Sequence, residues 1–220
     1  MTILGLLMAV FEITSCNRDD LQYSCDPEIN AWVLEHRIEY ADISRDQLIL
    51  FDYEQQRGLF ASFSPEQKVK IYQSKYHYLM GLNTLSKEEK EWLTIVFQRV
   101  TPNIYSSKKE RLDFIDFSEK WTYEVIEKLG WEPVDVYRYT HTWMTNDEFE
   151  HWLDFKRNQE STSSGSTRDV QPKLPCECYW DISCLWALNY CEKDEKCTTT
   201  DGGCGVANTT NCNGHCISLF

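Results

Sequence analysis

The chain of 220 residues carries 22 lysines and arginines against 35 aspartates and glutamates, which gives a net charge of −13 at pH 7. This acidic balance disfavours nucleic acid and anionic lipid as partners, because both select for clustered positive charge. It also disfavours a simple cationic pore-forming peptide. Hydrophobic residues make up 42% of the chain, which is enough to build the core of one medium domain with an appendage.

The first 20 residues resemble the export signal of a bacterial lipoprotein. The apolar run 3–11 is too short to span a membrane and has the length of a signal-peptide core. The sequence ITSC at 13–16 follows it and resembles a lipobox, in which the cysteine is lipidated and becomes the first residue of the mature chain. The segment NRDD at 17–20 ends in a short acidic run, which looks like the surface-export signal of Bacteroidota lipoproteins. We therefore predict a signal peptide over 1–16, a lipid anchor at Cys16 and an outer-membrane lipoprotein at the cell surface.

Two features depart from this pattern and leave a second interpretation open. No lysine or arginine precedes the apolar run, and Glu12 lies near its end. In the alternative, the N-terminus is a buried strand or helix, and Cys16 is an ordinary thiol that can form a bridge to Cys25. If Cys16 is lipidated instead, Cys25 has no partner within the chain, provided that the cysteines of the tail pair among themselves.

Residues 17–155 are predicted to form an all-α helical bundle of about five or six helices with short connections. Apolar and aromatic residues recur there every three or four positions, which is the spacing of a helix face packed on a core. Serine or threonine, followed three residues later by glutamate or glutamine, marks most of the helix starts. The predicted helices are 27–42, 45–61, 65–80, 87–100, 107–129 and 146–157, with caps at Ser44, Ser64, Ser86, Ser107 and Thr145.

Three of these helices have a well-defined apolar face. The residues expected on the core side are Val69, Tyr72, Tyr76 and Leu79, then Trp92, Ile95, Val96 and Val100, and then Leu112, Ile115, Trp121, Val125 and Leu129. Stop signals lie at Gly81, at 101–103 and at 130–133, where glycine or proline interrupts the pattern. The many aromatic residues of the chain are therefore expected to pack the bundle.

The composition changes sharply after the helical domain. Residues 156–175 are rich in serine, threonine and proline and show no apolar periodicity, so we predict a flexible, protease-sensitive linker. Residues 176–220 have few aliphatic side chains but eight of the ten cysteines of the chain. A module of this size cannot build an ordinary core, and disulfides are the usual substitute in an exported protein. The predicted disulfide cysteines are Cys176, Cys178, Cys184, Cys191, Cys197, Cys204, Cys212 and Cys216.

The pairing of these cysteines stays open, because eight cysteines allow 105 connectivities. Zinc is a weaker explanation of the cluster. The tail contains no C-x-x-C pair, and its only histidine is His215.

The order of the cysteines gives the tail a resemblance to a known family. It begins with Cys-Glu-Cys at 176–178, continues with single cysteines at intervals of five to seven residues, and includes Gly-Gly-Cys-Gly at 202–205 and a closing Cys-Asn-Gly-x-Cys at 212–216. This order resembles fulvocin C, an eight-cysteine bacteriocin, but it departs from it at the closing pair: three residues separate Cys212 from Cys216, whereas only one separates the last two cysteines of fulvocin C. The whole arrangement, with a Leu-Ser-x-Glu motif at 85–88 in the helical part, resembles the fulvocin C-related proteins. The resemblance implies a bacteriocin-like, antimicrobial role with damage to the membranes of competing bacteria.

No catalytic constellation occurs in the sequence, and we predict no enzyme activity, no cofactor and no metal site. Asp147, Glu148 and His151 fall within one helical turn, but acidic residues are so frequent here that a solvated helix face is the better explanation. The sequence at 208–210 is a glycosylation sequon, which carries little information in a bacterial protein.

Two functions are compatible with these features. In the first, an exported lipoprotein carries a bacteriocin-like tail, which acts on competing bacteria or their membranes after presentation or release. In the second, the protein is a surface-anchored, non-catalytic binding or scaffold lipoprotein, and the tail is a recognition module on a tether. The tail's six acidic and two basic side chains weigh against membrane insertion. The residues expected to contact a membrane or a partner are Trp180, Leu185, Trp186 and Leu188.

Overall fold

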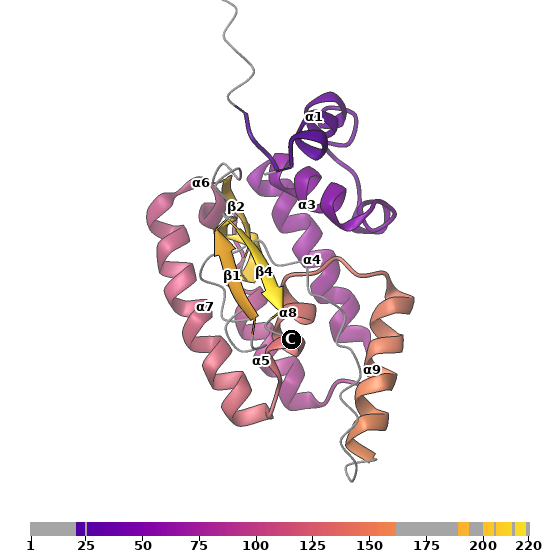
Figure 1. Cartoon of the computed structure of the whole chain (residues 1–220). Coiled ribbons are helices and arrows are strands. Elements are labelled where there is room, and N and C mark those ends of the chain that lie inside the picture. Colours follow the sequence, from indigo (N-terminus) through magenta and orange to yellow (C-terminus); the bar gives the residue numbers. More distant parts are fainter. Residues whose placement is uncertain are drawn as a thin grey trace, which may run out of the picture.

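A computed structural model describes residues 21–24, 26–161, 189–193, 200–204, 206–212 and 214–218. The described part of the helical domain contains nine helices (Figure 1). Their bounds are α1 Pro27–His36, α2 Arg45–Leu48, α3 Tyr53–Ser62, α4 Pro65–Gly81, α5 Lys87–Phe97, α6 Asn103–Ser106, α7 Lys108–Leu129, α8 Pro133–Thr140 and α9 Asn146–Ser161. In Figure 1, α4 runs through the middle of the bundle, with α7 on one flank and α9 on the other. The prediction of an all-α domain is confirmed.

The predicted helix starts are confirmed by their capping hydrogen bonds. The Ser64 hydroxyl accepts from the backbone N–H of Gln67 at 3.2 Å, and Pro65 occupies the first turn of α4. Ser86 and Glu89 cap each other at the start of α5, with hydrogen bonds of 3.1 and 2.8 Å. Each such cap satisfies a backbone group that the helix itself leaves without a partner, and contributes about 1 kcal/mol. Ser44, Ser107 and Thr145 cap α2, α7 and α9 in the same way.

Two helices of the described chain, α6 and α8, were not predicted. The stop expected at 130–133 is partly right, because α7 ends at Leu129 and Gly130 follows with a left-handed φ of 65°. Pro133, however, begins α8. A proline at the first helical position lacks only an N–H that would have no partner within the helix, so it can begin a helix as well as end one.

Other helix bounds differ from the prediction. Helix α1 ends at His36, not near residue 42. The helix expected over 45–61 is divided into α2 and α3, because the Asp52 side chain caps a second start. Helix α9 continues to Ser161 and so includes the first six residues of the predicted linker. The rest of that linker lies outside the described residues.

Aromatic side chains dominate the core of the bundle. Phe60, Tyr72 and Trp143 are fully buried, and their ring centroids lie 4.6 to 5.6 Å apart. Tilted and edge-to-face arrangements of this kind stabilise a core beyond the area they bury. Two residues expected on core faces, Ile95 and Leu112, are instead 44% and 51% exposed. The buried faces of their helices lie beside them, at positions that include Val96, Phe97 and Phe114.

The described part of the tail forms two nested antiparallel ribbons. Strand β1 (Asn189–Lys193) pairs with β4 (Gly214–Ser218), and β2 (Thr200–Cys204) pairs with β3 (Thr210–Cys212). A short 3-10 turn, η2 (Val206–Asn208), lies between β2 and β3. Strand β2 contacts α3, and η2 contacts α8, so these ribbons lie against the bundle, between α4 and α7 in Figure 1.

Neither a membrane span nor a metal centre occurs within the ranges described. No helix there has both the length and the apolar character needed to cross a bilayer. Over the same ranges, no group of three or more His, Cys, Asp and Glu side chains is arranged to bind a metal ion. Asp147, Glu148 and His151 of α9 therefore do not form such a group.

Candidate functional site: a loop of the tail buried in the helical domain

Residues 206–209 of the tail lie inside the helical domain, and we call them the docking loop. Ala207 is 1% exposed and Thr209 is 2% exposed. Val206 and Ala207 belong to the same hydrophobic cluster as the cores of the helices. A cysteine-rich module with little core of its own thus uses the core of its neighbour at this point.

The docking loop has an unusual backbone conformation. Ala207 and Asn208 are both left-handed, with φ values of 57° and 51°. Asparagine tolerates this region, whereas for alanine it costs about 1–2 kcal/mol. The Thr209 hydroxyl closes the turn by donating to the carbonyl oxygen of Val206 at 2.9 Å. Backbone strain of this kind persists only where the surrounding structure fixes it, and here the burial of the Ala207 methyl group does so.

Two tyrosines of the helical domain bind the docking loop. The Tyr105 hydroxyl of α6 donates to the carbonyl oxygen of Ala207 at 3.0 Å, and Nδ2 of Asn208 donates to the Tyr72 hydroxyl of α4 at 2.7 Å. A buried polar group without a partner costs about 1–3 kcal/mol, so these contacts make the burial of the loop tolerable. Burial raises the pKa of both tyrosines well above the ordinary value, and the phenols therefore stay protonated.

Tyr72 also belongs to a row of donors that binds the segment 138–146. This segment runs from the last turn of α8 to the first residue of α9, and every second carbonyl along it accepts a side-chain donor. Three of the donors follow one face of α4 at intervals of three residues, where side chains lie one above the other. All of the acceptors are backbone carbonyl oxygens. Lys75 donates to those of Arg138 at 3.0 Å and Thr142 at 2.6 Å, Tyr72 to that of Thr140 at 3.2 Å, Arg45 to that of Met144 at 2.9 Å, and Tyr78 to that of Asn146 at 3.3 Å.

Lys75 is a buried lysine whose hydrogen-bond partners are carbonyl oxygens rather than carboxylates. It is 3% exposed, and its ammonium group lies 5.5 Å from the ring centroid of Trp143. Burial lowers the pKa of Lys75 well below its ordinary value, and repulsion from Arg45 lowers it further. A donor at the carboxyl end of α8 is favoured, because the helix dipole is negative there. This geometry gives Lys75 a structural role in joining α4 to the segment 138–146.

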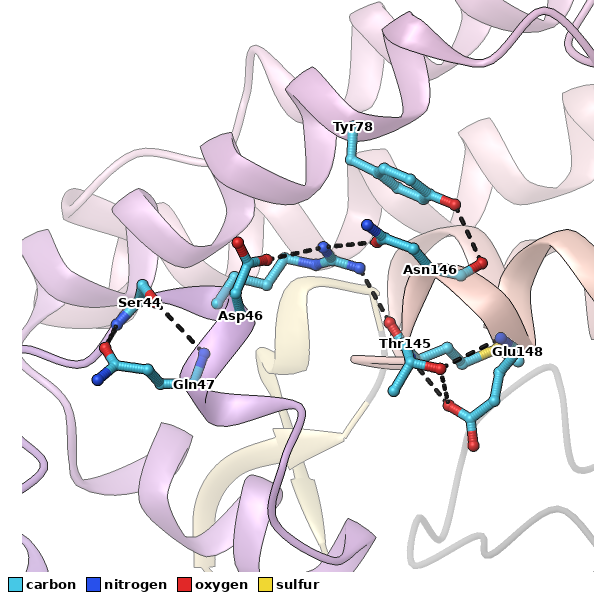
Figure 2. Close-up of polar contacts among 9 residues, drawn as sticks. Ser44, Asp46, Gln47, Tyr78, Thr145, Asn146 and Glu148 are labelled. Atoms are coloured by element: carbon cyan, nitrogen blue, oxygen red, sulfur yellow. Dashed lines mark hydrogen bonds and ion pairs between the residues drawn. The ribbon is translucent and has the colours of Figure 1, made fainter.

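Arg45 joins α2, α4 and α9 at the other end of that segment. It donates to Oδ1 of Asn146 at 3.2 Å, and its guanidinium lies 5.0 Å from the ring centroid of Tyr78. Figure 2 shows Tyr78 and Asn146 facing each other, with the capping pairs of α2 and α9 on either side. The ion pair between Arg45 and Asp46, at 3.6 Å, contributes little to stability because Asp46 is exposed to solvent. The neighbours labelled in Figure 2 are Ser44, Asp46, Gln47, Tyr78, Thr145, Asn146 and Glu148.

Lys68 lies beside the tyrosine that binds the docking loop. Its ammonium group is 5.3 Å from the ring centroid of Tyr105 and 5.7 Å from that of Phe60, which suits cation–π attraction. Burial, with a smaller contribution from Arg111, lowers the pKa of Lys68 to about 8. The stability of this part of the domain should therefore respond to alkaline pH.

The predicted site residues fall into two groups. The strands β1, β2, β3 and β4 contain Cys191, Cys204, Cys212 and Cys216, one each. That these four form disulfides stays a prediction. The remaining predicted residues lie outside the part of the chain that is described, and their roles stay predictions as well: Cys16, Cys25, Cys176, Cys178, Cys184, Cys197, Trp180, Leu185, Trp186 and Leu188.

The hydrogen bonds between the docking loop and the helical domain were not predicted from the sequence. Tyr72 was expected on a core face, which is confirmed, but Tyr105 and Asn208 had no predicted role. At Asn208 the sequence indicates only a glycosylation sequon. In the folded protein this side chain is buried and bonded to Tyr72, so it leaves no room for a glycan. An asparagine in a turn rich in glycine and threonine was the one available cue, because asparagine favours left-handed turns.

Searches against protein-family models, curated proteins and solved structures find no match to this chain. The resemblance of the tail to the fulvocin C-related proteins therefore stays a prediction. The docking loop is an intramolecular contact with apolar packing, two hydrogen bonds with tyrosines and a strained backbone.

Proposed function

We propose that this protein is a surface-anchored, non-enzymatic lipoprotein whose helical domain carries the cysteine-rich tail as a fixed recognition module for a partner. The observation that supports this most is the burial of the docking loop, with Ala207 in the shared core and Asn208 bonded to Tyr72 at 2.7 Å. A tail fixed in this way presents the rest of its surface in a constant orientation. The expected partner is a surface protein of the same or a neighbouring cell, not nucleic acid, because the chain carries a net charge of −13.

The energetics of undocking favour a tail that stays in place. Exposing a buried valine such as Val206 costs about 1.5–3 kcal/mol. Each hydrogen bond lost at Tyr72 and Tyr105 costs about 1 kcal/mol more. Cutting the chain between domain and tail would not break any of these contacts. The tail is therefore expected to remain bound even after proteolysis of the linker.

The order of the eight cysteines favours a second candidate function. In it, the tail is a bacteriocin-like effector, and the helical domain is its carrier or immunity-like holder. Release of the tail would then need two steps. The linker would have to be cut, and the docking loop would have to leave the core of the helical domain. Masking by the domain would keep the tail inactive in the producing cell.

Specific cleavage between domain and tail separates the two functions. A protease site placed at 163–168 of the full-length protein is cut under native conditions, and the products are analysed by gel filtration. We expect the tail fragment to elute with the helical domain and the cut protein to leave related strains alive. Separation of the tail on cutting would contradict the proposal, and killing by the separated tail would establish the second candidate. The same cut in an Asn208→Ala variant is the matched control, in which more tail should dissociate.

The anchor has its own test. The intact mass of the protein from the membrane fraction should correspond to a chain that begins at Cys16 and carries two or three acyl groups. A Cys16→Ala variant should lose this mass and leave the membrane fraction. A full-length chain without acyl groups in the wild type would remove the anchor from the proposal.

A further inference from the structure

The ladder between β1 and β4 places two cysteines opposite each other. Its five Cα pairs run without a shift from Asn189 with Ser218 to Lys193 with Gly214, and Cys191 with Cys216 is the central pair. Directly opposite residues of an antiparallel pair have Cα atoms about 4.5–5.5 Å apart. A disulfide joins Cα atoms about 4.4–6.8 Å apart. We propose that Cys191 and Cys216 form a disulfide that joins the outer strands of the tail.

The inner ribbon provides a contrast. Cys204 is paired with Thr210, and Cys212 with Thr200, with a shift of register between the two pairs. Cys204 and Cys212 are therefore at best diagonal neighbours, for which the spacing is about 7–8 Å and exceeds what a disulfide spans without backbone movement. Among the four cysteines of the described strands, the register supports one pair. The register assigns no partner to Cys204 or Cys212.

This bond would close a ring around the docking loop. The chain from Cys191 to Cys216 contains β2, the docking loop and β3, so the disulfide lies at the base of the nested ribbons and the buried loop at their tip. One end of the module would be fixed covalently and the other by the helical domain. With this pair assigned, the six remaining cysteines of the tail allow 15 connectivities in place of 105.

The proposal rests on the proposed function in one respect, because it needs export to an oxidising compartment. The two thiols lose two protons and two electrons as the S–S bond forms. These pass to a disulfide-bearing thiol oxidoreductase of that compartment, which is reduced to its dithiol.

Peptide mapping of the native, full-length protein tests the pairing. Free thiols are alkylated first, and the protein is digested without reduction. Cleavage after Tyr190 and Lys193 isolates Cys191 in 191–193, and hydroxylamine cleavage between Asn213 and Gly214 isolates Cys216 in 214–220. We expect the combined mass of these two peptides less two hydrogens, and its loss on reduction. Either cysteine joined to a different one, or either one alkylated, overturns the proposal.

The remaining thiols distinguish the two ways of failing. If the tail is fully oxidised but Cys191 is joined elsewhere, the pairing is wrong and the proposed function is unaffected. If all eight tail thiols are alkylated in the native protein, the export on which both depend is wrong as well. A Cys191→Ser variant should gain one alkylated thiol at Cys216, and a Cys191→Ser/Cys216→Ser variant should gain none. A Cys204→Ser variant, the matched control, should keep the 191–193 and 214–220 peptides joined.

Discussion

Phe60 and Ala207 lie in one hydrophobic core, but they reach it in different ways. Phe60 lies on helix α3, whose start is fixed locally by the capping box between Asp52 and Gln55. Ala207 comes from a strand connection with a left-handed backbone, and residues of α4 and α6 far away in the sequence bind its loop. The difference indicates that a module with too few apolar residues to build a core can bury part of its chain in the core of a neighbouring domain.

Removal of an aromatic side chain from the core that the helical domain shares with the docking loop should have the largest effect on stability. Trp143 is 1% exposed and packs on Phe60 and Tyr72, so Trp143→Ala leaves a cavity beside Tyr72, which binds the docking loop. We expect a loss of about 3–5 kcal/mol in the free energy of unfolding, measured in urea. Leu112→Ala is the control, since Leu112 is half exposed and should change stability by less than about 0.5 kcal/mol. Equal losses in the two variants would contradict this packing.

A larger side chain in the docking loop should act from the side of the tail. Ala207→Val adds two methyl groups to a full core and places a branched residue at a positive φ, so we expect a loss of about 2–3 kcal/mol. Ala207→Gly keeps the turn without strain and should stay within about 1 kcal/mol of the wild type. A valine tolerated as well as the glycine would indicate that residue 207 is not buried.

Much of the helical domain could be predicted from the sequence, but little of the docking loop and its contacts could. The caps at Ser64 and Ser86 were predictable because they depend on residues three positions apart. The contact of Asn208 with Tyr72 spans 136 positions, and no local pattern encodes it. The role of Lys75 could not be predicted either, because a lysine on a helix is ordinarily solvated. Its burial depends on carbonyls of the segment 138–146, which is distant in the sequence.

Alkaline pH should affect the helical side through Lys68. Its pKa of about 8 in the folded protein lies below the value near 10.4 of an unfolded chain, so the folded state binds fewer protons between these values. Stability should therefore rise as the pH increases through this window, by about 1 kcal/mol between pH 7 and 9 for this partly exposed group. Lys68→Met should remove that increment, as measured by urea unfolding at the two pH values. An unchanged pH dependence in the variant would show that Lys68 titrates normally.

Loss of a single cap should be the smallest change and should stay on the helical side. Ser86→Ala leaves the backbone N–H of Glu89 without its acceptor, and we expect a loss of about 0.5–1 kcal/mol. Amide hydrogen exchange in the docking loop should show no change relative to the rest of the protein. Selective loss of protection in the loop would mean that the two sides are more tightly coupled than their contacts indicate.

The central claim is that the tail is fixed in the helical domain through Tyr72, and a double-mutant cycle tests it most directly. The free energy of unfolding is measured for the wild type, Tyr72→Phe, Asn208→Ala and the double variant, with disulfides intact. The bond from Tyr72 to the Thr140 carbonyl is lost in both variants that carry Tyr72→Phe, so it cancels in the cycle. We predict a coupling energy of about 1 kcal/mol. The same cycle with Ser86→Ala in place of Asn208→Ala should be additive. Additive losses for Tyr72 and Asn208 would contradict the docking of the tail.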